Sequence, residues 1–329
     1  MSSSNAFKPP VKNGVGPSTV GIPANTSQSA IDFLVTKFSA ISSEEWQKRF
    51  QAREILNSVG QIMSPQDSLQ TESHLYYYRR IQDEPELPIK AAIIFQDDHL
   101  VVADKPHFMP VTPGGRYVQQ SLLVQLRTQL NLPDLSPIHR IDRETAGVVV
   151  FSVRAQDRNA YQELFRLREV EKTYEAVAGA PETSSLNLQF PLVHRSRMEE
   201  DVQFFRMREV SSEALNEPTE WNSETWIDCV ARQYASESYY PQQDSVAIPL
   251  ARYLLKPLTG QRHQLRVHMN ALGLPLFNDL FYPKVLLAAD EVDHLNSPLQ
   301  LLAKTIAFAD PVTGQTRCFE SARQLNALP

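Results

Sequence analysis

The sequence Pro137-Ile-His-Arg-Ile-Asp-Arg-Glu-Thr-Ala-Gly147 runs directly into the apolar segment Val148–Val153, and this junction decides the fold. The apolar segment is interrupted only by Ser152, which is typical of a buried strand. Five ionisable side chains stand where the chain is about to enter this core: His139, Arg140, Asp142, Arg143 and Glu144. Charged groups are rarely buried without partners, so Asp142 requires a cation close by. An arginine beside it would keep the carboxylate ionised and usable as a nucleophile or a base.

Outward from this junction, the spacing of apolar residues predicts strands joined by a few amphipathic helices. Helices are expected at about 122–130, 155–170 and 262–272, the last ended by Gly273. Strands are expected in two hairpins and four single segments, at 93–95 with 100–103, 302–308 with 316–319, 148–153, 172–178, 226–232 and 246–255. The polar segment Pro181–Glu224 carries little periodicity and is expected to be a loop. These elements predict an α+β fold built on a mixed, largely antiparallel sheet flanked by helices.

The chain divides by composition into three parts. Residues 1–27 are rich in Ser, Pro, Gly and Asn, and we expect a disordered tail. Residues 28–82 show two short helical patterns, the second opened by a capping box of Ser42 and Glu45, and a strand-like His74–Tyr78; they predict a small α+β module. Residues 83–329 form the large domain, which the acidic, proline-bearing linker Asp83–Pro88 introduces.

The bulk composition is that of an ordinary globular protein, with 42% hydrophobic and 21% charged residues. No apolar run is long enough for a transmembrane helix, and the N-terminus lacks the apolar stretch of a secretory signal. The two cysteines, Cys229 and Cys318, lie far apart, which argues against a disulfide framework. This cysteine usage fits a reducing cytosol, so we expect a cytoplasmic protein.

The net charge of −6 is unusual for a nucleic-acid binder, because neutralised phosphates dominate such affinities. A local basic patch matters more than the total charge. Between Asp244 and Asp279 there is no carboxylate, and the segment holds Arg252, Lys256, Arg262 and Arg266 together with His263 and His268. This segment is either a solvated basic face or a site for an anionic partner.

Three interpretations of the His139–Asp142 cluster compete. An Arg-x-Asp-Arg cluster seen alone is more often a structural ion-pair group than an active site. His139-Arg-Ile-Asp142 also resembles a kinase catalytic loop, but no Asn follows at the required place, and Asp-Phe-Gly and a glycine-rich phosphate loop are missing. His139 and Asp142 could begin a metal site, yet no ligand cluster of recognisable spacing accompanies them. We expect neither a metal nor a nucleotide cofactor.

Four blocks of the sequence resemble the RluA-type pseudouridine synthases. His139–Gly147 is similar to the family pattern His-Arg-Leu-Asp-x-x-Thr-Ser-Gly, with Ile in place of Leu and Ala in place of Ser. Leu258–His268, followed by Gly273, Pro275 and Asp279, is similar to the segment Thr-Gly-Arg-x-His-Gln-Ile-Arg-Val-His. Glu171–Tyr174 is similar to the Lys-x-Tyr strand, and Ala103–Pro106 to the Lys-Pro turn. The blocks keep the family's order, and the resemblance extends from about Ile89 to Leu328.

Three departures from the family pattern concern RNA contacts and therefore the substrate. Gln261 and Arg262 replace an Arg followed by Thr or Ser, and Asn278 stands where a Gly normally precedes the Asp. His107-Phe-Met109 replaces small residues after the Lys-Pro turn. None of these positions belongs to the expected catalytic set.

The resemblance implies the pseudouridine synthase fold and the conversion of uridine to pseudouridine in RNA without a cofactor. Asp142 would be the catalytic carboxylate, acting on either the sugar or the base, and Arg266 would pair with it. Tyr174 would stack on the target base and take part in removing the C5 proton. Arg140 would fill the place that the flipped base leaves. Further substrate contacts are expected from His139, Arg143, Lys172, Arg262 and His263, whereas His268 could equally be a packed core histidine.

The same resemblance implies RNA as the partner, either ribosomal or transfer RNA, and a monomer is the default. The module at 28–82 resembles a degenerate S4 RNA-binding domain. An alternative is a catalytically idle RNA-binding or RNA-chaperone protein on the same fold, but the presence of Asp142, Tyr174 and Arg266 favours the enzyme. A third hypothesis, an enzyme of another reaction class, requires the four ordered matches to be coincidental.

Overall fold

The computed structural model describes residues 7, 9–81, 83–202, 206–210, 220–234, 249–286 and 293–326, and the chain divides into two compact units. The first unit comprises residues 1–86 and 112–133, and the second comprises residues 87–111 and 134–329. These units differ from the predicted parts, because residues 112–133 group with the N-terminal segment rather than with the large domain. Every helix of the described residues is too short or too polar to cross a bilayer.

The first unit holds a three-stranded antiparallel sheet in the order β1-β3-β2, with strands Ser18–Gly21, His74–Tyr77 and Ile55–Asn57. Helices α1 (Ala30–Lys37) and α2 (Ser43–Gln51) bury Leu34 and Trp46 in its core. The Ser42 hydroxyl accepts a hydrogen bond from the Glu45 amide at 3.2 Å, so the predicted helix start is confirmed. The prediction of a disordered tail through residue 27 is wrong, because β1 pairs with β3 along its whole length.

Helix α3 (Leu122–Leu130) belongs to this first unit because it packs on the N-terminal segment. Val124 of α3 shares a buried cluster with Val15 and Val118. Arg127 Nη1 donates a hydrogen bond to the Gly14 carbonyl oxygen at 3.2 Å. The sequence predicted this helix but gave no sign of its partner, which lies more than a hundred residues away.

The second unit is built on one ten-stranded sheet, and its mixed, largely antiparallel character was predicted correctly. The main strand order is β4-β5-β7-β14-β8-β13-β12-β9, with β6 paired to β7 and β15 paired to β14. The strands are β4 (Ala92–Gln96), β5 (Leu100–Lys105), β6 (Ser136–Pro137), β7 (Ala146–Ser152), β8 (Glu171–Gly179), β9 (Leu192–Ser196), β12 (Ser223–Tyr234), β13 (Pro249–Pro257), β14 (Leu301–Ala309) and β15 (Thr316–Glu320). The pair of β14 with β7 is parallel, and the other pairs are antiparallel.

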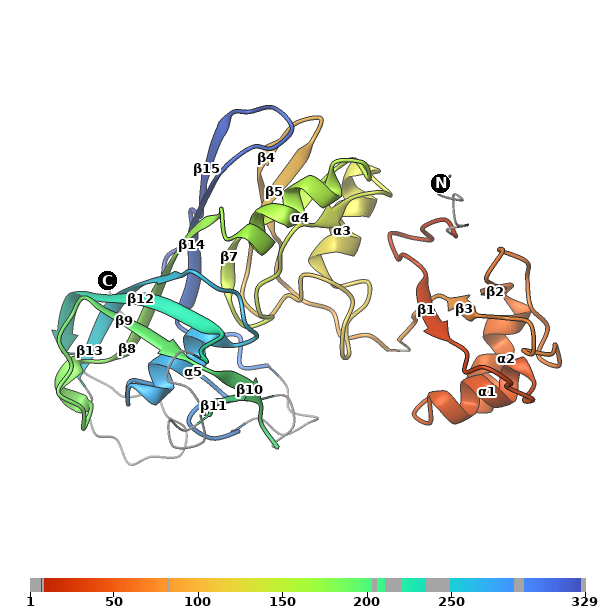
Figure 1. The fold of residues 1–329 in the computed structure, drawn as a ribbon, viewed down its shortest axis with the longest axis horizontal. Helices are drawn as coiled ribbons and strands as arrows, with labels where there is room; N and C mark the ends of the chain where they lie inside the picture. Colours follow the sequence, from red (N-terminus) through yellow and green to blue (C-terminus); the bar gives the residue numbers. More distant parts are fainter. Residues whose placement is uncertain are drawn as a thin grey trace. The chain divides into compact units, whose positions relative to one another are not determined.

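Two helices pack on different parts of this sheet (Figure 1). Helix α4 (Arg158–Leu167) buries Tyr161 and Leu164 against residues of β5, β7 and β14. Helix α5 (Gln264–Ala271) buries Leu265 and Met269 against residues of β8 and β13. The four sequence blocks therefore lie at or beside the ends of strands of this sheet, which two separate hydrophobic clusters hold in place.

The segment Pro181–Glu224, predicted to be a loop, instead contributes β9, a short helix at Pro181–Thr183 and a two-stranded sheet of β10 (Met198–Glu200) and β11 (Met207–Glu209). Strand β9 pairs with β12 at the edge of the large sheet. Its sequence Leu-Val-His-Arg-Ser alternates only weakly in polarity, because an edge strand does not have to be apolar on both faces. The loop prediction is wrong for this reason. Residues 246–248 of the predicted strand at 246–255 lie outside the described residues.

One row across the sheet brings the first and third sequence blocks together. Gly147 of β7 is opposite Ala303 of β14, and Ala303 is opposite Tyr174 of β8. Gly147 has φ +116°, and a Cβ atom there would lie 2.2 Å from the Ala303 carbonyl oxygen. Only glycine allows this close approach of β7 to β14. The glycine that ends the first block therefore positions the loop of Asp142 relative to Tyr174.

Candidate active site

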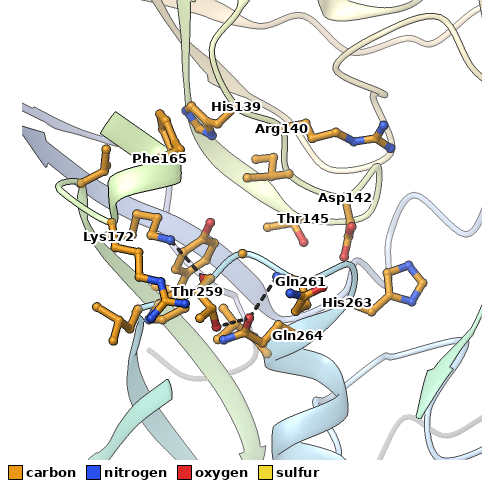
Figure 2. Close-up of a pocket in the computed structure, with 18 of the residues that line it drawn as sticks. His139, Arg140, Asp142, Thr145, Phe165, Lys172, Thr259, Gln261, His263 and Gln264 are labelled. Atoms are coloured by element: carbon orange, nitrogen blue, oxygen red, sulfur yellow. Dashed lines mark hydrogen bonds between the residues drawn. The ribbon is translucent and has the colours of Figure 1, made fainter. Parts of the chain in front are cut away.

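A pocket of about 480 Å³ in the second unit collects residues of three of the sequence blocks (Figure 2). Its walls are the loop 138–145, the end of α4, the start of β8 and the segment 257–266. Of the nine residues predicted to act in catalysis or substrate binding, seven line it: His139, Arg140, Asp142, Lys172, Tyr174, His263 and Arg266. Arg143 and Arg262 do not line it.

Arg266 is the buried cation of the site, with 1% of its side chain exposed. Its Nε and Nη2 atoms donate to both oxygens of Asp279 at 2.8 and 2.6 Å, which is the bidentate geometry that fixes a guanidinium. Its Nη1 atom lies 3.6 Å from Asp142 Oδ2 and 3.7 Å from Glu144 Oε2. Burial alone would lower the pKa of Arg266, but these carboxylates, Asp279 foremost, raise it above its ordinary value. Arg266 is therefore a permanent positive charge.

Asp142 is the carboxylate that meets this charge at the pocket surface. Its side chain is 24% exposed, and Figure 2 shows it directed from its loop towards the segment of Gln261 and His263. The Thr145 amide donates to the Asp142 carbonyl oxygen at 3.2 Å, so the backbone turns tightly at this point. Asp142 can thus touch a ligand in the pocket while Arg266 holds it from behind.

Two residues of β8 that are separated by one position face this pocket. Lys172 Nζ donates to the Thr259 carbonyl oxygen at 3.2 Å, and burial lowers the pKa of Lys172 to about 8. Burial, with a smaller contribution from the charge of Asp142, raises the pKa of Tyr174 above its ordinary value. Tyr174 is therefore a neutral phenol, which can stack or hydrogen-bond but is a poor base.

The second block builds the floor of the pocket through inward hydrogen bonds. Gln264 Oε1 accepts from Thr259 Oγ1 at 2.7 Å and from the Gln261 amide at 3.0 Å. Gln264 Nε2 donates to the Glu224 carbonyl oxygen at 2.9 Å. His263 has φ +56° and forms a hydrogen bond through Nδ1 with Tyr282 Oη at 3.0 Å. Burial, with the nearby charge of Arg266, lowers the pKa of His263 to about 3, so this histidine is neutral.

His139 is a structural acceptor as well as part of the pocket wall. Its Nε2 atom accepts a hydrogen bond from the Val150 amide of β7 at 3.1 Å. The adjacent Ile138 amide donates to the Val150 carbonyl oxygen at 3.1 Å, so the two residues continue the pairing of β7 beyond β6. The ring stacks on Phe165 of α4 at 5.0 Å. Burial lowers the pKa of His139 to about 3, which keeps the imidazole neutral and able to accept.

The remaining predicted arginines differ in their surroundings. Arg140 is exposed at the pocket, and among the described residues its side chain has no hydrogen bond or ion pair. Arg143 forms a bidentate pair with Asp293 at 2.7 and 2.9 Å, which favours a structural role over the predicted substrate contact. Arg262 donates to the Arg206 carbonyl oxygen at 3.2 Å and lies 3.4 Å from Glu200.

Sequence reasoning gave no role to several residues of the site. Asp279, the main partner of Arg266, was noticed only as part of the second block; it also accepts from the Phe281 amide at 2.8 Å. Asn278 has φ +60°, which explains why a Gly is usual there and why Asn can replace it. Arg166 and Arg168 of the α4 end also line the pocket, and their proximity to it could not be inferred from spacing.

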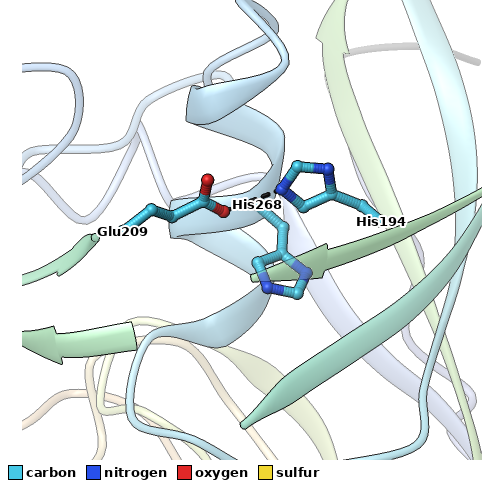
Figure 3. A group of neighbouring side chains, drawn as sticks. All are labelled: His194, Glu209 and His268. Atoms are coloured by element: carbon cyan, nitrogen blue, oxygen red, sulfur yellow. Dashed lines mark hydrogen bonds and ion pairs between the residues drawn. The ribbon is translucent and has the colours of Figure 1, made fainter. Parts of the chain in front are cut away.

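His194, Glu209 and His268 form the group of possible metal ligands found among the described residues (Figure 3). Their nearest ligand atoms lie within 4.8 Å of one another, and His194 Nε2 is 2.8 Å from Glu209 Oε1. Both nitrogens of His268 are occupied by hydroxyls, Nδ1 by Thr225 at 2.9 Å and Nε2 by Ser223 at 3.0 Å. This arrangement favours a hydrogen-bonded core histidine over a ligand, and burial lowers the pKa of His268 to about 3.

Comparisons with known proteins point to one family. The sequence profile described as RNA pseudouridylate synthase matches residues 99–271. The dual-specificity RNA pseudouridine synthase RluA of Escherichia coli K12 is 29% identical over 70% of this chain and 91% of its own length. RluA of Salmonella typhi is 30% identical over 69% of this chain and 91% of its own.

A solved structure shares the fold. Human RNA Pseudouridylate Synthase Domain Containing 1 superimposes with a TM-score of 0.53 at 22% identity, over 72% of this chain and 86% of that chain. The chain therefore belongs to the RNA pseudouridylate synthase family, and the resemblance seen in the four blocks is confirmed. As a member of this family it is an isomerase that converts uridine to pseudouridine in RNA.

Proposed function

We propose that the pocket around Asp142 is the active site and that Asp142 is its catalytic carboxylate. The observation that carries this proposal is that Asp142 is the only carboxylate among the described residues that line the pocket, and it faces the buried guanidinium of Arg266. An ionised carboxylate held by a cation and still open to a ligand is suited to act as a nucleophile or a base. The idle RNA-binding alternative gives no reason for this arrangement.

The reaction needs no oxidant and no energy input. The N1–C1′ bond of uridine breaks, the uracil turns, and a C5–C1′ bond forms; the C5 hydrogen leaves as a proton and N1 gains one. Asp142 assists either at the sugar carbon or on the base, and these two routes stay open. The cation beside it, Arg266, supports both.

Tyr174 and Arg140 have complementary proposed roles. Tyr174, held as a phenol beside Asp142, stacks on the uracil as it turns; its raised pKa argues against the phenolate that proton removal at C5 would use. Extruding a base from a stack costs a few kcal/mol. Arg140, exposed at the pocket mouth, fills the vacated place because a guanidinium can both stack and hydrogen-bond.

The RNA backbone is proposed to contact the basic rim of the pocket. Arg166 and Arg168 line it together with Arg140 and Lys172. Arg166 pairs with Glu163 at 3.0 Å, whereas the side chain of Arg168 has no ion pair or hydrogen bond among the described residues. With Arg266, five cations line this pocket against one carboxylate, and this local excess offsets the acidic total charge of the chain.

The substrate is proposed to be ribosomal or transfer RNA. Support comes from the bacterial relatives, which are named dual-specificity RNA pseudouridine synthases. A cytoplasmic location and a monomeric state remain predictions of the sequence. An S4-like role for residues 28–82 also remains a prediction.

The test is pseudouridine mapping of total RNA from cells that lack the gene, complemented with wild type, Asp142→Asn or Asp98→Asn. Asp98 is a matched control because it is exposed and paired with Arg154 outside the pocket. We expect wild type and Asp98→Asn to restore one or a few sites and Asp142→Asn to restore none. Full restoration by Asp142→Asn would mean that another group performs the chemistry.

A further inference from the structure

The guanidinium of Arg266 has one nitrogen that two carboxylates approach equally. Asp279 engages Nε and Nη2, which leaves Nη1 to face Asp142 Oδ2 at 3.6 Å and Glu144 Oε2 at 3.7 Å. Nη1 is buried and has no hydrogen-bond partner among the described residues. Its two hydrogens therefore lie between two acceptors that are both slightly too far for a hydrogen bond.

Glu144 is held in place from the side away from Arg266. Its Oε1 atom accepts from Arg143 Nε at 3.0 Å, and Arg143 is itself fixed by its bidentate pair with Asp293. The Glu144 carbonyl oxygen accepts from His107 Nδ1 at 2.6 Å. The Glu144 side chain is 12% exposed and does not line the pocket, so it is placed to act on Arg266 rather than on a ligand.

We propose that Glu144 is a positioning residue that shares Arg266 Nη1 with Asp142 and so keeps Asp142 from being locked into a full ion pair. This inference rests on the proposed role of Asp142. With Glu144 in place, Nη1 stays midway between the two carboxylates. Without it, Asp142 would be the only carboxylate attracted to Nη1 and would close on it into a hydrogen-bonded ion pair, which makes Asp142 less available to the substrate.

The charges around Asp142 and Glu144 determine whether the acid limb of activity moves to lower or to higher pH when Glu144 loses its charge. Arg266 of α5 and Arg143 of the same loop are cations, and Asp279 is a further carboxylate on Arg266. Burial lowers the pKa of Lys105 of β5 to about 7, while His107, His263 and Tyr174 are neutral. A like charge close to a carboxylate favours its protonated form. Removing the charge of Glu144 therefore favours the ionised form of Asp142, and the acid limb of activity moves to lower pH.

The experiment measures pseudouridine formation against pH with purified full-length variants and total RNA from cells that lack the gene, at saturating and at low RNA. Glu144→Gln removes the charge and keeps the acceptor for Arg143. Glu144→Asp keeps the charge but withdraws it from Arg266 by one methylene. Glu320→Gln is the matched control, because Glu320 is exposed and paired with Lys304 outside the pocket.

We expect the acid limb of the rate at saturating RNA to move down by about half a pH unit or more in Glu144→Gln, and less in Glu144→Asp. The rate above that limb should fall several-fold, and the KM for RNA should stay within about twofold because Glu144 does not line the pocket. Glu320→Gln should match wild type in all three readouts.

Two results would overturn the inference. One is a wild-type pH profile in both Glu144 variants, with any loss of rate explained by a lower folded fraction in circular dichroism; if Glu144→Gln does not fold, Glu144→Asp alone decides. The other is an Asp142→Asn enzyme that still forms pseudouridine, which removes the proposed function itself. The two failures are distinguishable because only the second concerns Asp142.

Discussion

The loop 139–145 and the segment 258–268 both carry family motifs, yet they use their polar side chains in different ways. The loop presents Arg140 and Asp142 to the pocket, where a ligand can reach them. The segment turns Gln264, Arg266 and His268 inward, where other protein groups satisfy them. The first region supplies the chemistry, and the second supplies the rigid support that holds it.

This comparison shows that a motif residue is not necessarily a ligand contact. His139 stands three residues before Asp142, but its ring completes the pairing of β7 through the Val150 amide. Arg143 directly follows Asp142, but it pairs with Asp293. Buried polar groups must find partners, so a motif can be maintained by the needs of the fold alone.

The largest effect is expected from breaking the support at Arg266. Arg266→Lys keeps one charge but cannot make the bidentate pair with Asp279 and also face Asp142. Disrupting a buried pair in this way should lower the free energy of unfolding by about 3–5 kcal/mol and the rate at saturating RNA by roughly a hundredfold or more. Urea unfolding and pseudouridine formation measure the two effects.

Arg195→Lys is the matched control for this substitution. Arg195 is half-exposed and pairs with Glu224 at 2.7 Å, so its replacement should change stability by no more than about 0.5 kcal/mol. If Arg266→Lys were as stable and as active as Arg195→Lys, the segment 258–268 would not be the support of the site.

The second largest effect is a loss of folding stability at acid pH, which the neutral histidines of the two regions cause. The pKa values of His139, His263 and His268 are each lowered to about 3, chiefly by burial. In the unfolded chain a histidine titrates near 6.5, so below that pH the unfolded state binds more protons than the folded state. The stability that these neutral histidines contribute is therefore present above about pH 6.5 and is lost as the pH falls below that value. Each histidine should cost about 1 kcal/mol between pH 6.5 and pH 5.5.

Urea unfolding at these two pH values measures the loss, and single substitutions divide it between the regions. His139→Gln in the first region and His268→Gln in the second should each remove roughly a third of the loss from the three histidines. An unchanged pH dependence in these two variants would show that the two rings take up protons in the folded protein.

Much of the fold and the location of the site followed from the sequence, because both depend on local patterns. The apolar run after Gly147 identified β7, and Gly273 marked the end of the helix that is α5. Strands β9, β10 and β11 were missed because they are short and polar, and their pairing partners are not encoded by periodicity.

The directions of the side chains in the site could not be predicted from the sequence, and the reason is a different one. Asp293, the partner of Arg143, lies 150 residues further along the chain. In the first unit, Arg127 of α3 likewise contacts Gly14, which lies 113 residues before it. Residue type indicates that an arginine needs an anion, but only tertiary structure selects between a neighbouring carboxylate, a distant one and an RNA phosphate. Of the predicted arginines, Arg266 is therefore buried behind Asp142, Arg143 belongs to a structural ion pair, and Arg140 is exposed at the pocket.

The smallest effect tests a residue outside both regions. Arg168 ends α4, lines the pocket and has no motif to mark it. If it contacts an RNA phosphate, Arg168→Gln should weaken RNA binding a few-fold at low salt and reduce the slope of log affinity against log salt by roughly 0.7–0.9. Arg154→Gln is the control, because Arg154 is partly exposed and pairs with Asp98 outside the pocket. Filter binding across a salt series measures both variants. Equal slopes for the two would confine the RNA contacts to the motif regions, whereas a lower slope for Arg168→Gln alone would show that the substrate is also held by a residue that the family pattern does not contain.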